Sequence, residues 1–365
     1  MTRYTRRKAL QTASAVALSP IAAPLLSAAQ VPAAPKEGKD TPKIALGMGD
    51  GGGTRGQNNP DRSASVRRIK QLGVDNVLSG GPGRLPWTVE TLTSVMEPWK
   101  TGGIQVGNLM IGLSNDILYG KPGNKRDEDI EKIKQSIIAA GQVGLPIVEY
   151  NFYAHRAMEG YFEEIDTERG NSGWTGFDFE LEQTADRPYQ TRPEEKGMKF
   201  KDLPPLPNEG AHSLDEMWNN ATYFLKAVIP TAEKANVRLA LHPNDPPAPI
   251  SRGSGQIMAT LAGWKKLISI VDSPANGITF DCGVTRELGE DPVEVCRYFG
   301  SRDRINHVHF RNVIVMKPYS SVTPVIVCTT LLLTYGLKSK VTGSFGTKFP
   351  MASLILAVTV RYVAA

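Results

Sequence analysis

Three short apolar runs that each end in polar residues decide the fold: VRLALHPNDPP at residues 237–247, GITFDCG at 277–283 and INHVHFRNV at 305–313. Longer amphipathic or polar segments separate these runs along the chain. This alternation is typical of successive β-α units around a parallel sheet. The three runs therefore predict an α/β protein in which consecutive strands end in polar side chains.

The same alternation extends back to residue 43 and predicts the remaining strands and helices. Seven strands are expected in all, at residues 44–47, 74–78, 105–111, 146–150, 237–242, 277–281 and 305–310. Six helices are expected with them, at residues 63–72, 89–99, 126–143, 214–235, 259–271 and 292–299. In the third helix, Ile130, Ile133 and Ile137 recur every three or four residues, as expected when one helix face lies on a sheet. We therefore expect a TIM (β/α)8-type barrel whose eighth β/α unit is lost or replaced.

Residues 153–213 interrupt this alternation after the fourth strand. They contain prolines, glycines and charged residues but no sustained period, so a long irregular insertion is predicted there. Long loops at the carboxyl ends of barrel strands usually carry function. The insertion is therefore expected at the same mouth of the barrel as the polar strand ends.

Charge is unevenly distributed along the 365 residues. The net charge is +5, from 42 basic and 37 acidic residues, but residues 1–29 and 313–365 hold basic residues and no acid. The part between them is mildly acidic, with 33 basic and 37 acidic residues. Nucleic-acid binding needs a basic surface on the folded body, so a nucleic-acid partner is not expected. The three cysteines, Cys282, Cys296 and Cys328, lack a framework spacing and exclude a disulfide-stapled domain.

The first 29 residues read as an export signal. Arg6 and Arg7 precede an apolar stretch at 9–26, and small residues at 27–29 suit a cleavage site. The arginine pair predicts a twin-arginine signal peptide and hence an exported, periplasmic protein. An ordinary secretory signal or a lipid-free membrane anchor is the alternative. Residues 30–42, with three prolines, are predicted to be a linker.

The polar strand ends supply a candidate metal site. In a parallel barrel the carboxyl ends of all strands meet at one mouth, so His242, the Asp281-Cys282 pair and His309 are expected to converge. Imidazole, carboxylate and thiolate are ligands of divalent first-row metals. Asp281 and Cys282 cannot both point inward along a regular strand, so either one is the third ligand. His307 shares the face of His309 but lies deeper, which suggests a packing or supporting role. A single His or Cys at a strand end is more often a buried, hydrogen-bonded or inert residue than a ligand, and it is the succession of three such strand ends that favours a shared metal site.

Four stretches carry a resemblance to a known family: YNFY at residues 150–153, LHPNDPP at 241–247, GITFDCG at 277–283 and HVHFRNV at 307–313. Together they make residues 43–313 similar to the mannonate dehydratase family, in the xylose-isomerase-like barrel superfamily. The resemblance implies a hydro-lyase that converts a small sugar acid, D-mannonate, to 2-dehydro-3-deoxy-D-gluconate in glucuronate breakdown. It also implies a divalent metal, Mn²⁺ or Fe²⁺, and allows a homo-oligomer.

The resemblance assigns ligands residue by residue. His242 and His309 match metal ligands of the family pattern. The usual thiolate position is occupied by Asp281, and a carboxylate there favours a harder ion such as Mn²⁺.

Candidate substrate-binding residues follow the strands. Arg156, after the fourth strand, has the planar fork that binds a carboxylate through two hydrogen bonds, and a surface ion pair is its alternative role. His155 beside it, Arg311 after the seventh strand, and Asn151 of the YNFY stretch complete the set.

The composition changes abruptly after Val313. Residues 314–365 contain no Asp, Glu, His, Asn or Gln. The resemblance places there an eighth strand with a Pro-Asp-His element that supplies the last metal carboxylate and a catalytic acid or base, so the catalytic residues stay unassigned. The tail is interpreted as a frameshifted end, as membrane-associated segments at 323–337 and 351–365 that are too short to span a bilayer, or as an unusual closing strand at 325–333.

Two expectations follow from this tail. The chain as written is expected to be inactive or nearly so, and an open sheet edge is expected to make it prone to aggregate. Two other functions remain open at this point: a sugar isomerase or epimerase on the same barrel, and a non-catalytic exported protein that binds a sugar acid.

Overall fold

A computed structural model describes residues 43–48, 62–166, 172–184, 192–313, 315 and 329–334. The predicted signal peptide at 1–29, the predicted linker at 30–42 and most of the tail at 314–365 lie outside these residues. The described residues all belong to one unit within residues 40–365. None of the helices in this described part is both long and apolar enough to cross a bilayer.

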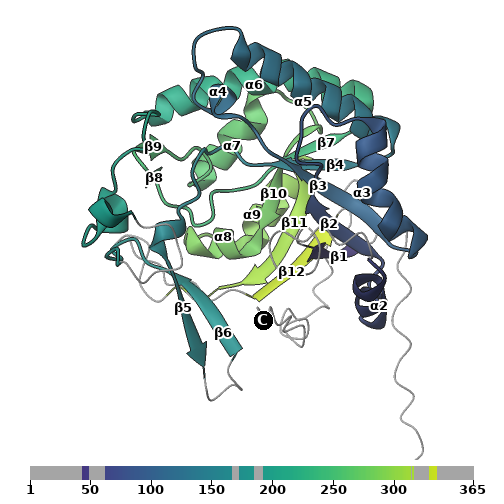
Figure 1. The fold of residues 1–365 in the computed structure, drawn as a ribbon, viewed down its shortest axis with the longest axis horizontal. Coiled ribbons are helices and arrows are strands. Elements are labelled where there is room, and N and C mark those ends of the chain that lie inside the picture. The colour runs from purple at the N-terminus through teal and green to yellow at the C-terminus, as the bar shows by residue number, and fades with distance from the viewer. Residues whose placement is uncertain are drawn as a thin grey trace, which may run out of the picture. The chain divides into compact units, whose positions relative to one another are not determined.

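Eight strands form a closed barrel in the order β1-β12-β11-β10-β7-β4-β3-β2 (Figure 1). Their bounds are β1 Lys43–Met48, β2 Asn76–Gly80, β3 Gln105–Ile111, β4 Ile147–Tyr150, β7 Arg238–Leu241, β10 Asn276–Asp281, β11 Ile305–Asn312 and β12 Thr329–Thr334. All neighbours from β1 to β11 pair in parallel. The seven predicted strands are therefore confirmed, with ends that differ by one or two residues.

The eighth strand closes the barrel in the opposite direction. β12 runs antiparallel to both of its neighbours, pairing Lys43 of β1 with Thr334 and Asn312 of β11 with Thr329. The prediction of an open sheet edge was wrong, because β12 pairs with both strands that would otherwise be edges. The Thr- and Leu-rich run TTLLLT overlaps the closing strand considered at 325–333. The eighth β/α unit is thus replaced by an antiparallel strand.

Helices surround this sheet on its outer side (Figure 1). The six predicted helices are confirmed as α2 Ser63–Gln71, α3 Val89–Thr101, α5 Lys125–Gln142, α6 Leu214–Ala235, α7 Leu261–Ile270 and α9 Pro292–Gly300. The longest, α6, begins with a capping box between Ser213 and Glu216 and ends at Asn236, which adopts a left-handed φ of 55°. Its buried face includes Met217, Phe224 and Val228, which pack into the main core.

The insertion contains more structure than its sequence indicates. A hairpin of β5 Tyr161–Asp166 and β6 Ser172–Phe177 and three 3-10 turns, η1 Met158–Gly160, η2 Pro193–Glu195 and η3 Phe200–Asp202, lie within 153–213. Tyr161, Phe177, Phe179 and Phe200 pack edge to face in a small separate core. These aromatic residues are too widely spaced in sequence to produce a local period, which is why the insertion was predicted to be irregular.

Four short elements were also not predicted. They are α4 Asn115–Leu118, α8 Cys282–Glu287 and the two-residue strands β8 Ile250–Ser251 and β9 Ser254–Gly255. The helix α8 begins directly at the end of β10, so the GITFDCG stretch is a strand followed at once by a helix.

Candidate metal centre

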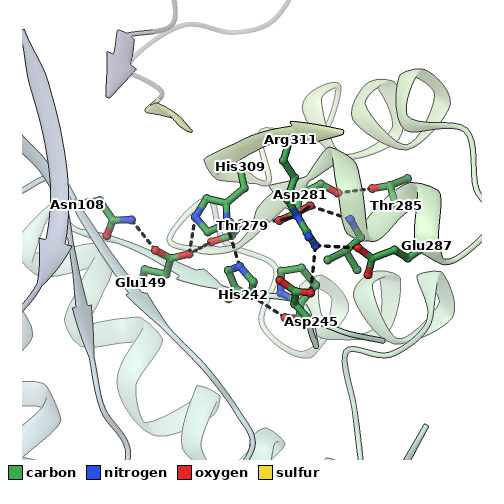
Figure 2. A network of polar contacts seen from close by, with 12 residues as sticks. Asn108, Glu149, His242, Asp245, Thr279, Asp281, Thr285, Glu287, His309 and Arg311 are labelled. Atoms are coloured by element: carbon green, nitrogen blue, oxygen red, sulfur yellow. Dashed lines mark hydrogen bonds and ion pairs between the residues drawn. The ribbon is translucent and has the colours of Figure 1, made fainter. Parts of the chain in front are cut away.

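Three side chains from three strand ends converge at the mouth of the barrel. Glu149 lies on β4, His242 follows β7, and His309 lies on β11. One ligand atom from each lies within 4.8 Å of the other two. Figure 2 shows the two imidazoles and the carboxylate facing one another, with Asp281 and Arg311 beside them. Two imidazole nitrogens and one carboxylate oxygen are a donor set for a divalent cation.

The protonation of His242 suits a metal ligand. Its Nδ1 lies 2.6 Å from the carbonyl oxygen of Pro243, so Nδ1 carries the proton and donates it. Its Nε2 lies 2.9 Å from Nδ1 of His309. Burial and the neighbouring His309 lower the pKa of His242, which keeps the ring neutral. The lone pair of Nε2 therefore faces Nδ1 of His309, inside the three-residue group.

Two hydrogen bonds orient the carboxylate of Glu149. Asn108 on β3 donates its Nδ2 to Oε2 at 2.9 Å, and Thr279 on β10 donates its Oγ1 to Oε1 at 2.7 Å. Glu149 is only 1% exposed. Burial acts to raise its pKa, but His309, the other two histidines and the bond from Thr279 outweigh it and lower the pKa to about 2. Glu149 is therefore a buried carboxylate at neutral pH.

His309 lies between two acids. Its Nε2 is 3.5 Å from Oε1 of Glu149 and its Nδ1 is 3.5 Å from Oδ2 of Asp281. Burial acts to lower the pKa of His309, but the two acids outweigh it and the pKa is raised. Nε2 is buried and has no hydrogen-bond partner among the described residues. This orphaned nitrogen is a further indication that the cluster accommodates a cation.

His307 lies next to this group without belonging to it. Its ring centroid is 5.0 Å from that of His309, and its side chain is fully buried. Burial lowers the pKa of His307 to about 3, so the ring is neutral. Neither ring nitrogen has a hydrogen-bond partner within the described part of the chain. His307 is thus buried beside His309, in line with the deeper position expected from the sequence.

Asp281 and Cys282 have different surroundings in the structure. Asp281 accepts hydrogen bonds from Nε of Arg311 at 2.9 and 3.0 Å and from the backbone N–H of Val284 at 2.8 Å, which caps α8. Burial acts to raise the pKa of Asp281, but Arg311 and His309 lower it well below its usual range. Cys282 packs instead against the hydrophobic core, and burial raises its thiol pKa to about 12. Asp281 thus lies beside the three-residue group, whereas Cys282 packs against the hydrophobic core.

Arg311, expected to bind substrate, is committed to other side chains. Besides Asp281, its Nη2 lies 3.2 Å from Asp245 and 3.1 Å from Glu287, and its side chain is 5% exposed. A Cβ on Gly283 would lie 2.7 Å from Arg311, so glycine is required for this approach. Burial raises the pKa of Glu287 well above its usual range.

Arg156 and Asn151 were also expected to bind substrate. Asn151 directly follows β4, and Arg156 lies further along, at the rim of the barrel mouth. Arg156 is 49% exposed, with Nη2 3.5 Å from the hydroxyl of Tyr161 and 3.9 Å from a carboxylate oxygen of Asp245. The side chain of Asn151 contacts Sδ of Met110 at 3.6 Å, and its Oδ1 lacks a hydrogen-bond partner among the described residues.

His155 belongs to a second buried cluster, which we call the insertion network and which consists of His155, Glu159, Glu195 and Arg252. His155 lies 3.2 Å from Oε1 of Glu159. Arg252 donates its Nε to Glu159 at 2.9 Å and its Nη2 to Glu195 at 2.9 Å. Because Arg252 follows β7 and the two glutamates lie in the insertion, the network ties the insertion to the barrel.

Sequence reasoning missed Glu149, Asp245 and Glu287. Glu149 carries the clearest signal, because it is an acid inside the four-residue strand IVEY that is otherwise apolar and fully buried. Such an acid requires partners, and it lies two residues before Asn151, on the same side of the strand.

Comparison with known proteins identifies the family. The family model of D-mannonate dehydratase (UxuA) matches residues 56–323, most of the chain. The chain belongs to the mannonate dehydratase family. It is 28% identical over 275 residues to a mannonate dehydratase of Streptococcus equi subsp. zooepidemicus, covering 71% of this chain and 72% of that protein. It is 29% identical over 286 residues to the enzyme of Thermotoga maritima, covering 68% and 73%.

The fold agrees with this membership. The crystal structure of mannonate dehydratase from Streptococcus suis serotype 2 matches with a TM-score of 0.58 and 24% identity, over 78% of this chain and 76% of that one. The resemblance stated from sequence and the expected barrel fold are both confirmed. Membership in a family of hydro-lyases places the chain among carbon-oxygen lyases, and the group of Glu149, His242 and His309 together with the family suggests a divalent metal.

Proposed function

We propose that this chain dehydrates D-mannonate to 2-dehydro-3-deoxy-D-gluconate at a divalent-cation site made by Glu149, His242 and His309. The observation that carries the proposal is the convergence of these three ligand atoms within 4.8 Å at the barrel mouth. The family match supports the reaction, since relatives at 28% and 29% identity are mannonate dehydratases.

The residues present fit the cation. One carboxylate and two imidazoles, with no thiolate among them, favour Mn²⁺ or Fe²⁺. Asp281, 3.5 Å from Nδ1 of His309, adds a second negative charge beside the site. When bound, a divalent cation stabilises the negative charge that develops on the acid as the proton next to its carboxylate leaves.

Other residues of the chain orient the metal ligands. Asn108 and Thr279 hold the Glu149 carboxylate through hydrogen bonds from two different strands, and the Pro243 carbonyl fixes the tautomer of His242. These partners keep the ligand atoms in place before a cation arrives. Arg156 at the rim supplies a partly exposed cation for the substrate.

We further propose that turnover is low. Residues 314–365 hold no Asp, Glu or His, whereas the family resemblance places a metal carboxylate and an acid or base in this region. A positioned acid or base typically contributes about 10²–10⁴-fold to rate. Glu149 supplies a carboxylate from β4, but the tail holds no Asp, Glu or His that could replace the acid or base. A frameshift after Val313 accounts for this composition, and the gene would then encode a Pro-Asp-His element in another reading frame.

An assay of the purified chain tests the proposal. We expect 2-dehydro-3-deoxygluconate from D-mannonate in the presence of Mn²⁺, at a rate about 100-fold or more below that of an intact family member. Glu149→Gln should abolish the remaining rate. Product formation that Glu149→Gln leaves unchanged would overturn the proposed site. A rate equal to that of an intact relative would overturn the claim of low turnover.

We also propose that residues 1–29 export the protein to the periplasm, with the Arg6-Arg7 pair as the recognised feature. Replacing both arginines by lysine should retain the protein in the cytoplasm. Cell fractionation that finds the variant in the periplasm at the original level would contradict this.

A further inference from the structure

A cavity of about 400 Å³ lies at the end of the barrel where the strands begin, opposite the mouth. Its lining includes the first residue of each of three parallel strands: Lys43 of β1, Asn76 of β2 and Gln105 of β3. Pro146, just before β4, also lines it, and Glu149 of the metal-centre group lies three residues further along. Three residues of a strand span about 10 Å, so the cavity is separate from the candidate metal centre.

The lining combines positive charge with an apolar wall. Lys43 and Lys100, which lies in the last turn of α3, contribute two ammonium groups, and none of the described residues that line the cavity is Asp or Glu. The amide side chains of Asn76 and Gln105 add hydrogen-bond donors. Apolar side chains form much of the remaining wall: Met96, Ile104, Val106 and Pro146. An apolar wall with a few polar groups is typical of sites for small molecules.

The charge of Lys100 is only weakly engaged by the protein. Its Nζ lies 3.9 Å from Oε2 of Glu97, which is longer than a hydrogen bond, and the two side chains are 79% and 53% exposed. Exposed pairs of this kind contribute little to stability. An anion in the cavity can therefore take the place of Glu97 beside Lys100.

The surroundings of the cavity are basic, although the central part of the chain is mildly acidic. The helix α2 lies against the chain that follows α3, since a Cβ on Gly102 would lie 2.6 Å from the side chain of Val66. A surplus of positive charge beside a cavity raises the local concentration of anions. Residues 43–48, 62–76 and 96–107 hold the basic residues Lys43, Arg62, Arg67, Arg68, Lys70 and Lys100 but only the acids Asp75 and Glu97.

We propose that this cavity is a second binding site, which takes a small organic anion. The anionic group contacts Lys43 and Lys100, and the apolar part of the ligand packs against Ile104 and Val106. A volume of about 400 Å³ admits one small molecule rather than a polymer. The proposal goes beyond the proposed function, because neither the cavity nor its test involves dehydration or the metal.

The test uses two dyes that share an apolar body and differ in one charge. Anilinonaphthalene sulfonate carries a sulfonate, and N-phenylnaphthylamine is the same ring system without it. Both dyes gain fluorescence in apolar surroundings, so titration of the full-length protein gives an affinity for each. Comparing how a variant changes the two affinities isolates the contribution of the sulfonate.

Removal of both lysine charges should affect one dye only. The double variant Lys43→Gln, Lys100→Gln should weaken binding of the sulfonated dye by about tenfold or more, as loss of charge-assisted contacts predicts. Its affinity for the neutral dye should change by less than about twofold. Should the double variant fail to fold, Lys100→Gln alone, at a largely exposed position, should still weaken the sulfonated dye by about threefold.

A matched control exists on α5. Lys134 pairs with Glu131, three residues before it, just as Lys100 pairs with Glu97 on α3. Lys134 is not among the residues that line the cavity. Lys134→Gln should therefore leave both affinities unchanged.

The outcomes decide the proposal in either direction. A loss restricted to the sulfonated dye and to the variants of Lys43 and Lys100 supports the anion site. Unchanged binding in the double variant would place the dye elsewhere and overturn the site. An equal loss for both dyes, or the same loss in Lys134→Gln, would also overturn it.

Discussion

The barrel mouth contains two buried ionic clusters that differ in what they leave open. In the insertion network, the cation Arg252 binds the carboxylates of Glu159 and Glu195. In the metal-centre group of Glu149, His242 and His309, the ligand atoms face one another, and no arginine or lysine of the described residues contacts them. One cluster neutralises its acids with an arginine, whereas the other sets a carboxylate against two imidazoles.

This difference indicates separate roles. Buried charges need a partner, because leaving an isolated charge in the interior is costly. The insertion network satisfies this need internally and attaches the insertion to the barrel. The metal-centre group balances Glu149 only with histidine rings, which lose their protons far more readily than arginine. Its arrangement therefore suits exchange of such a proton for a metal cation. Variants in the two clusters should therefore affect different measurements.

The largest expected effect is loss of the metal from the three-residue group. Glu149→Gln and His242→Ala each remove one of three ligands, so metal content should fall from about one ion per folded chain to near zero. Elemental analysis after gel filtration measures this. Cys282→Ser is the control and should keep full metal content, because the thiol packs against the core. Equal loss in the control would contradict the assignment.

The insertion network should respond in stability instead. Arg252→Met leaves two buried carboxylates without their cation and should lower the free energy of unfolding by about 3–5 kcal/mol. Chemical denaturation measures the change, and metal content per folded chain should stay near that of wild type. Arg297→Met, which breaks an exposed pair with Glu294, should have little effect. An Arg252→Met protein that is as stable as wild type but lacks metal would contradict the separate roles assigned to the two clusters.

Asp281 should have an intermediate effect on the metal. Asp281→Asn keeps a side-chain oxygen that can cap α8 but removes the charge beside His309 and Arg311. Metal affinity should fall by about 10–100-fold, as for other residues that support ligands. Titration with Mn²⁺ measures it. Complete loss of metal would instead make Asp281 a ligand, as the sequence suggested.

The smallest expected effect is a pH-dependent contribution of the insertion network to stability. Burial acts to raise the pKa of Glu195, but hydrogen bonds from Arg252 and the backbone outweigh it and lower the pKa. A carboxyl group with a lowered pKa stabilises the fold above its unfolded pKa of about 4.3, and this contribution is lost as pH falls through the folded value. The stability difference between wild type and Glu195→Gln should therefore shrink below about pH 4.3. A difference that stays constant down to low pH in denaturation curves would contradict this.

Much of this organisation could be predicted from local sequence. Strand periodicity placed His242 and His309 at one mouth, because parallel strands end at the same edge. Glu149 could not be assigned in this way, since its role depends on Asn108 from β3 and Thr279 from β10, which are distant in sequence. The three acids that contact Arg311 are also distant from it in sequence.

The closing strand shows a second limit. The composition of TTLLLT indicates a strand, but its antiparallel direction follows from where the chain returns, between β1 and β11. The open edge was predicted because the parallel pattern ends at β11. Local residues alone carry no information on strand direction.

Anomalous X-ray diffraction from crystals of the protein loaded with Mn²⁺ tests the central claim most directly. The account predicts one strong manganese peak about 2.0–2.3 Å from a carboxylate oxygen of Glu149 and from ring nitrogens of His242 and His309. A peak beside Cys282, or no peak in well-ordered crystals grown with excess Mn²⁺, would contradict it.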